Sequence, residues 1–252
     1  TRLFIALAST TASLPLAQWQ LGRMQALPVL LLSLALLPWL LPLSRFNTGR
    51  RRLLRGAGVV LVSGVIALQL IRMGGDQLLV VHDGSRDLLV ARHGGRGALI
   101  SRRADGLSCS RSRQLAAGLG VQRYDWILLL DPLAAEEPGC WRALTPTLLA
   151  QQDGSPPLEL GQRLASPGLS VAPLTGDSQA LGLQAGRRRW TLLPDRQAWW
   201  SWRRAGSDRS PDGHDLWLGF APSAAERRQL PRRPGNRLWW ATAGSGSGWH
   251  LA

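Results

Sequence analysis

The feature that most constrains this chain is the absence of acidic residues from its first 75 positions. All 16 Asp and Glu residues of the 252-residue chain lie from Asp76 onward, whereas 8 of the 30 basic residues precede it. Residues 27–43 and 56–71 are two uncharged, mostly apolar runs. The first run, of 17 residues, is at the short end for a membrane-spanning helix, and the second has 16 residues. We therefore expect a membrane part over residues 1–75 and a soluble part over residues 76–252.

Five arginines lie between the two apolar runs, with no acid among them: Arg45, Arg50, Arg51, Arg52 and Arg55. The positive-inside rule places such a loop in the cytoplasm, which leaves residues 76–252 on the extracytoplasmic side. The alternative is that both runs are core helices of a soluble domain. Because the chain begins at Thr1 rather than Met, and because two short helices make a poor bundle, we expect the C-terminal part of a longer membrane protein.

The basic residues are all arginine, and the net charge is +14. Arginine binds phosphate bidentately and stacks on rings, although GC-rich coding also favours it. Within residues 187–204, six arginines accompany four tryptophans. Aromatic rings among cations suit single-stranded nucleic acid, whereas core packing or lipid contact is the alternative. The residues expected to contact DNA are Arg187, Arg188, Arg189, Trp199, Trp200, Trp202, Arg203 and Arg204.

From Asp76 onward, short apolar runs alternate with Gly and Asp turns, which is typical of strands. We expect a hairpin turning at Gly94 and Gly95, then a helix from Ser110 to about Leu119 that ends at Gly120. The remaining expected elements are a buried strand at 125–132, a short helix at 141–150, a strand–turn–strand unit at 179–195, a helix with a capping box formed by Ser223 and Glu226, and a final hairpin over 236–252. The elements fall into two successive halves, each with a β-hairpin, a helix and a buried strand. This order predicts an αββα sandwich with the helices outside.

This order of elements after two membrane spans resembles ComEC-type competence proteins. The resemblance implies transport of single-stranded DNA and a metallo-β-lactamase-like soluble domain. Residues 82–90, HDGSRDLLV, are similar to that family's D-V-G-Q-G-D turn, with Gly84 and Asp87 on its glycine and aspartate. Residues 94–103 resemble its second strand, although Ser101 and Arg102 stand where the family has I-D-x-G. Three further stretches carry the resemblance. Residues 5–19 resemble the end of the family's membrane domain, residues 115–132 its buried strand, and residues 177–195 its second half.

The metal ligands that this resemblance implies are missing. Where active members have T-H-x-H-x-D-H, this sequence places Asp131 and Glu136 at the first and last histidines, but Leu133 and Ala135 at the other two ligands. Asp195 falls on the aspartate of the second half's T-G-D turn. Leucine and alanine bind no metal, and carboxylates alone favour Mg²⁺ or Ca²⁺ over zinc. We therefore expect a degenerate site at Asp131, Glu136 and Asp195, without metal, cofactor or catalysis.

Other candidate residues favour structural roles. The four histidines, His82, His93, His214 and His250, are scattered, and we expect them in exposed loops. His82, Ser85 and Asp87 share one turn, which by itself does not build a catalytic triad. Residues 94–97, GGRG, lack the lysine of a phosphate-binding P-loop. Cys109 and Cys140 fit no metal or redox motif, so we expect buried free thiols, with a disulfide as the alternative.

Together these features predict part of a DNA-uptake channel for natural transformation, in the bacterial inner membrane, whose soluble domain binds or guides DNA outside the cytoplasm. The expected partners are single-stranded DNA, membrane lipid, the remaining transmembrane helices of the same protein and other DNA-uptake proteins. Two alternatives stay open. One is a divergent metal-dependent hydrolase or nuclease that processes incoming DNA, and the other is a membrane-anchored structural or partner-binding domain.

Overall fold

The structure is a computed structural model that describes residues 26–40, 48–83, 86–133, 138–152, 155–176, 179–206, 214–230, 238–240 and 248–251. These residues form two units, which are described separately. The first contains a pair of apolar helices, α2 (Ala26–Leu40) and α3 (Thr48–Gly74). The second contains two β-sheets with shorter helices beside them.

Helix α3 starts earlier than the sequence predicts. It begins at Thr48, so Arg50, Arg51, Arg52 and Arg55 lie in its first turns rather than in a loop, while Arg45 falls outside the described residues. Arginine and leucine are good helix formers, which explains the extension. Within α3, the stretch Arg52–Gln69 is long and apolar enough to cross a membrane, whereas the apolar part of α2, Pro28–Leu37, is shorter. Length and composition therefore support one of the two expected spans.

Twelve strands form two six-stranded sheets among the described residues. The first sheet has the order β12-β1-β2-β3-β4-β5, and the second has the order β11-β10-β9-β8-β7-β6. The strands of the first sheet are β12 (Gly248–Leu251), β1 (Gln77–Asp83), β2 (Arg86–His93), β3 (Arg96–Ser101), β4 (Trp126–Pro132) and β5 (Thr147–Gln151). Those of the second are β11 (Leu238–Trp240), β10 (His214–Leu218), β9 (Arg188–Leu193), β8 (Leu181–Ala185), β7 (Leu169–Pro173) and β6 (Leu164–Ser166).

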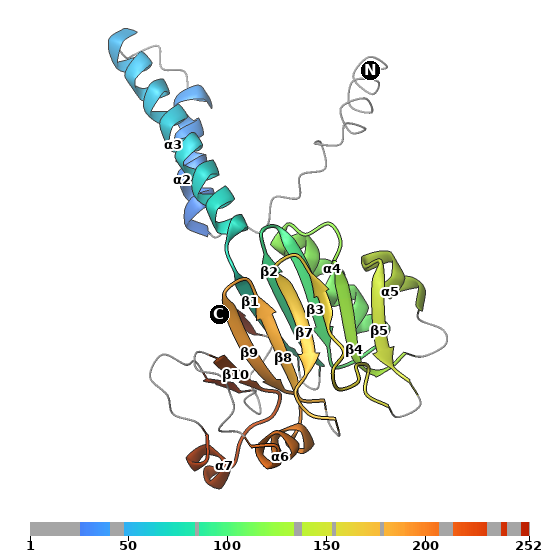
Figure 1. Cartoon of the computed structure of the whole chain (residues 1–252). Helices are drawn as coiled ribbons and strands as arrows, with labels where there is room; N and C mark the ends of the chain where they lie inside the picture. Colours follow the sequence, from blue (N-terminus) through green and yellow to red (C-terminus); the bar gives the residue numbers. More distant parts are fainter. Residues whose placement is uncertain are drawn as a thin grey trace. The chain divides into compact units, whose positions relative to one another are not determined.

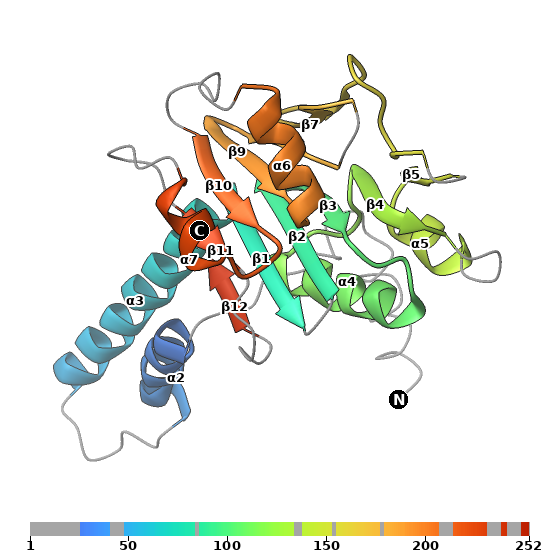
Figure 2. The ribbon, with the colours of Figure 1, turned by 90° about the horizontal axis from the view of Figure 1, so that it is seen from below.

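Four helices accompany the sheets: α4 (Gly106–Leu119), α5 (Pro138–Leu144), α6 (Arg196–Arg204) and α7 (Ala224–Arg228). Helices α4 and α5 lie beside the first sheet, whereas α6 and α7 lie beside the second (Figures 1 and 2). One buried cluster contains side chains from both sheets, including Leu89 and Leu128 from the first and Leu183 and Trp190 from the second. The second unit is therefore a mixed α/β fold in which two sheets share one core.

Several local predictions are confirmed. The β2–β3 hairpin turns at Gly94 and Gly95, which have φ values of 55° and 80°. Helix α4 ends where expected and is followed by Gly120 with φ 70°, a left-handed conformation that glycine adopts without strain. Ser223 and Glu226 form the predicted capping box of α7. These features depend on neighbouring residues alone, so the sequence pattern is sufficient to find them.

Three element predictions are wrong. Strands β11 and β12 are not partners in the hairpin expected at 236–252, because β11 pairs with β10 in the second sheet and β12 pairs with β1 in the first. The helix expected at 141–150 ends at Leu144, and β5 begins at Thr147 as a parallel partner of β4. Helix α4 begins at Gly106 rather than Ser110, because Asp105 accepts a hydrogen bond from the Ser108 N–H at 2.8 Å and so caps it.

Candidate functional site

The ends of the parallel strands in the second unit meet at one edge, which we call the carboxyl edge. Strands β3, β4 and β5 run parallel in the first sheet, as do β9, β10 and β11 in the second. The Gln179 side chain donates to the carbonyl oxygen of Leu130 at 2.8 Å, and Arg102 donates to that of Gly219 at 3.5 Å. These bonds join the two sheets at this edge, where open α/β folds place their ligands.

A row of three polar side chains crosses the carboxyl edge of the first sheet. His82 and Asp87 are direct partners in the β1–β2 ladder, and Nδ1 of His82 lies 2.5 Å from Oδ1 of Asp87. On the other side, Nη1 of Arg102 lies 3.5 Å from Oδ2 of Asp87, whose side chain is only 1% exposed. A buried carboxylate is stable only when it is paired, so both neighbours are needed by the fold. The expectation of an exposed loop histidine is wrong for His82, and Ser85 lies outside the described residues.

The carboxylates that the sequence singles out have separate structural partners. Asp131, at the end of β4, lies 3.9 Å from Nε of Arg103. Burial raises the pKa of Asp131 above its ordinary value, and the charges of Arg103 and Arg102 oppose that rise. Asp195 caps α6, because its Oδ1 accepts the Ala198 N–H at 2.7 Å. Each of the two carboxylates therefore already has a partner within the fold.

The expected metal-loop residues do not assemble into a described metal site. Across the residues that the structure describes, no three His, Cys, Asp or Glu side chains are close enough to hold a metal ion. Leu130, at the threonine position of the family motif, is 1% exposed and belongs to the core. Glu136 and Glu137 lie outside the described residues. The carboxyl edge is thus an ion-paired surface in which Asp131 is held by arginine.

Strand β9 divides the Arg- and Trp-rich stretch into two parts. Arg187 lies in the β8–β9 turn, and Arg188 and Arg189 begin β9. Helix α6 begins beyond the other end of this strand, and Trp190 between them is fully buried. A six-residue strand spans about 20 Å. The eight residues expected to contact DNA therefore fall into two groups at opposite ends of β9.

Only one of the three tryptophans of α6 is exposed. Trp199 and Trp202 are 1% and 7% exposed, and their rings pack 5.6 Å apart in a cluster with Leu193, Leu216 and Leu218. Trp200 is 47% exposed. The helical period of 3.6 residues explains this, because positions 199 and 202 face the sheet while position 200 points away. For Trp199 and Trp202 the burial favours the alternative of core packing over the expected contact with DNA.

The exposed side of α6 joins that of α7 in a basic surface. Arg203 places its guanidinium 5.6 Å from the Trp199 ring centroid and donates to Oε1 of Gln229, directly after α7. Arg227 and Arg228 are exposed, and no described carboxylate forms an ion pair with either. Glu226 is buried in the capping box and pairs with Arg196 at 3.4 Å. The surface that results, called the basic face below, consists of Trp200, Arg203, Arg204, Arg227 and Arg228.

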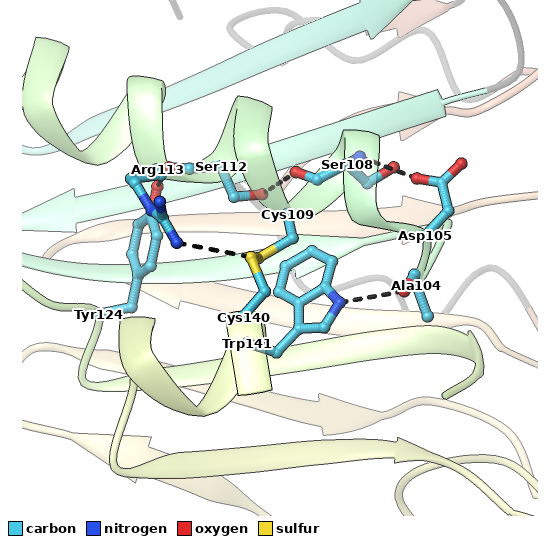
Figure 3. Close-up of a disulfide and its surroundings, with 9 residues drawn as sticks. All are labelled: Ala104, Asp105, Ser108, Cys109, Ser112, Arg113, Tyr124, Cys140 and Trp141. Atoms are coloured by element: carbon cyan, nitrogen blue, oxygen red, sulfur yellow. Dashed lines mark hydrogen bonds between the residues drawn. A yellow bond between two sulfur atoms is a disulfide. The ribbon is translucent and has the colours of Figure 1, made fainter. Parts of the chain in front are cut away.

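The two cysteines form a disulfide between α4 and α5, so the expectation of free thiols is wrong (Figure 3). Next to it, the buried Trp141 donates its indole N–H to the carbonyl oxygen of Ala104 at 3.0 Å. Nη2 of Arg113 lies 3.7 Å from Sγ of Cys140. Disulfides form and persist mainly in compartments outside the cytoplasm. The bond therefore links α4 covalently to α5.

No protein-family model, curated protein or solved structure matches this chain closely enough to show a family. The likeness to ComEC-type proteins accordingly stays a prediction from the sequence.

Proposed function

We propose that this chain belongs to a ComEC-like DNA-uptake protein of the bacterial inner membrane, in which the second unit binds single-stranded DNA outside the cytoplasm without cleaving it. The observation that carries the proposal is the basic face, where one exposed tryptophan stands among arginines. A ring among cations binds a single strand by stacking on bases and attracting the backbone. Binding of this kind does not depend on the base sequence, which suits the uptake of DNA of any sequence.

Two separate features support the membrane topology. The arginines at the start of α3 favour a cytoplasmic position for that end of the helix, by the positive-inside rule. Helix α3 contains a stretch suited to crossing a membrane, so the chain after Gly74 would emerge on the other side. The disulfide between Cys109 and Cys140 favours the same side for the second unit. The charge pattern and the redox chemistry are independent, and they agree.

The finer fold that we propose is a metallo-β-lactamase-like αββα sandwich. It is supported by two sheets with one shared core and by helices beside each sheet. A non-catalytic role is supported by the engagement of Asp131 with Arg103 and by the use of Asp195 as a helix cap. Nε of Arg103 lies 3.9 Å from the Asp131 carboxylate, so a cation already lies beside it.

Oligonucleotide binding by the full 252-residue chain in detergent tests the proposal. We expect Trp200→Ala to raise the Kd for a fluorescent single-stranded oligonucleotide roughly 5- to 150-fold, the effect of losing one stacked base. Trp240→Ala is the matched control, because Trp240 is 39% exposed but lies in β11. If Trp200→Ala and Trp240→Ala bind alike, the basic face is not the DNA site.

The salt dependence of binding gives a second readout. Replacing Arg227 and Arg228 together by Gln is expected to lower the slope of log K against log salt by about 1.4, since each lost phosphate contact on a single strand contributes about 0.7. Arg142→Gln on α5 is the control for a surface arginine outside the basic face. Metal-dependent cleavage of the oligonucleotide by the wild-type chain would instead favour the divergent hydrolase.

A further inference from the structure

The helix pair α2–α3 forms an open apolar pocket that DNA binding does not explain. Its volume is about 230 Å³, and its lining residues are Ala35, Leu36, Trp39, Gly58, Val59, Val62 and Ser63. Small side chains create it. Gly58 packs directly on the carbonyl of Ala35, since a Cβ at position 58 would lie 2.7 Å from that oxygen. The helices therefore approach closely here and leave a gap beside the contact.

An arginine lies next to one of the residues that line this pocket. Trp39 lines the pocket, and the Arg55 guanidinium lies 5.1 Å from its ring centroid. Arg55 precedes Gly58 and Val59 by one helical turn, and its Nε is buried without a hydrogen-bond partner. Arg52 lies one turn further toward the start of α3 and is exposed. A donor without a partner beside an apolar pocket fits a ligand with an anionic head and an apolar tail.

Many exposed side chains on the two helices around the pocket are apolar. They lie on both helices and include Leu34 and Leu40 of α2 and Val60 and Ile71 of α3. Residues 1–75 contain no carboxylate that could satisfy Arg52 or Arg55. Tryptophan and arginine are also the residues that anchor helices at the headgroup level of a membrane. Lipid is thus the partner that matches both the apolar surface and the charge.

We infer that the α2–α3 pocket binds an anionic phospholipid, with part of one acyl chain between Trp39 and Val62 and the headgroup phosphate at Arg55 and Arg52. The volume is below the roughly 300 Å³ of typical small-molecule sites, so it accommodates part of one chain rather than a whole lipid. This inference rests on the membrane location proposed above, and it adds a selective lipid site to that location.

Lipid retention tests the inference. The full chain is reconstituted in vesicles of phosphatidylcholine and phosphatidylglycerol in equal amounts, extracted in mild detergent, and its bound lipids are counted by native mass spectrometry. We expect phosphatidylglycerol to be retained in preference to phosphatidylcholine. Arg55→Gln is expected to reduce that preference about fivefold, the effect of one arginine at an anionic surface. Val59→Phe, which fills the pocket, is expected to abolish it.

Two matched variants control for general effects. Val60→Phe adds the same bulk at the next position, which is 73% exposed and does not line the pocket. Arg142→Gln removes one arginine from the second unit. Both are expected to retain lipid like the wild type. Equal retention of the two lipids by the wild type, or identical retention by Val59→Phe and Val60→Phe, would overturn the lipid site while leaving the membrane location intact. A chain that does not float with vesicles at all would overturn both.

Discussion

Nδ1 of His93 lies 2.5 Å from Oδ1 of Asp76, and this pair closes one end of the β1–β2 hairpin. At the other end of the hairpin, Nδ1 of His82 lies 2.5 Å from Oδ1 of Asp87. The Arg187 N–H, in the β8–β9 turn of the second sheet, donates to the second oxygen of Asp76 at 3.2 Å. Asp76 therefore connects both sheets at the end opposite the carboxyl edge, and His93, whose side chain is 37% exposed, ends β2 rather than lying in a loop.

Replacing Asp76 should weaken the fold in a way that depends on pH. Burial raises the pKa of Asp76, but the hydrogen bonds from His93 and Arg187, with the charges of His93 and Arg188, outweigh it and lower the pKa below its usual 3.8. Such a group stabilises the fold above its unfolded-state pKa, and this stabilisation is lost as the pH falls through the folded-state pKa. We expect Asp76→Asn to reduce the free energy of unfolding at neutral pH by about 1.5–3 kcal/mol.

Urea denaturation at neutral pH and at successive values below pH 3.8 measures this difference, which should shrink toward the acid end. Asp125→Asn is the control, because Asp125 is 22% exposed but pairs at 3.3 Å with Arg96, which is 51% exposed, and pairs of exposed charges contribute about 0.2–1 kcal/mol. A difference between Asp76→Asn and wild type that stays constant over this range would contradict the assigned pairing.

Gly168 should be sensitive to substitution because of His93. Gly168 has φ 78°, and a Cβ built there would overlap Cδ2 of the His93 ring. Gly161 has φ 91° but nothing within 4 Å of such a Cβ. We expect Gly161→Ala to destabilise by about 1–2 kcal/mol through backbone conformation alone, and Gly168→Ala by clearly more. Thermal unfolding of the two variants compares them, and equal losses would mean that the His93 ring does not pack there.

Reduction of the disulfide should destabilise the second unit. Cys109 and Cys140 are separated by 31 positions, and a loop of that size corresponds to about 3–4 kcal/mol in the chain-entropy description. Urea denaturation with and without a reducing agent measures the loss. The double variant Cys109→Ser with Cys140→Ser should unfold at the same urea concentration in both conditions. A wild-type chain that is equally insensitive would show that the bond does not form.

The neighbouring tryptophans Trp199 and Trp200 should respond oppositely to substitution. Trp199→Ala removes a buried ring from the core of the second sheet and is expected to cost about 3–5 kcal/mol of stability. Trp200→Ala is expected to change stability by no more than about 0.5 kcal/mol, because its ring is exposed. Denaturation curves of the two variants separate the roles, and a large loss for Trp200→Ala would place that ring in the core.

Asp131 should be dispensable for both stability and DNA binding. Its raised pKa means that folding disfavours the charged carboxylate, a penalty that grows as the pH rises through the folded-state pKa. The side chain is 42% exposed, so solvent screening keeps the effect small. We expect Asp131→Asn to be as stable as wild type or more stable by up to about 0.5 kcal/mol at neutral pH, with unchanged oligonucleotide affinity. A loss of oligonucleotide affinity in this variant would indicate that the carboxyl edge is part of a binding site.

The sequence alone determines the features that depend on neighbouring residues. The turn at Gly94 and Gly95, the end of α4 at Gly120 and the capping box of Ser223 each need only a few consecutive positions. The apolar run of β4 is equally local, since a buried strand excludes polar side chains. The contrast between an acid-free beginning and a mixed-charge remainder is visible without coordinates, and it lies next to the boundary at Gly74, although residues 117–122 also group with the first unit.

Only the tertiary structure decided which distant residues meet. The pairing of β12 with β1, the bond between Cys109 and Cys140, and the Asp76–His93 pair all join residues far apart in the chain, and no local pattern encodes them. The same holds for the candidate DNA site. Arginine and tryptophan are adjacent in the sequence, but the sheet under α6 buries Trp199 and Trp202 and leaves Trp200 outside. Burial is a property of the packed fold. The sequence therefore indicates the candidate residues, and only the packing shows which of them are exposed.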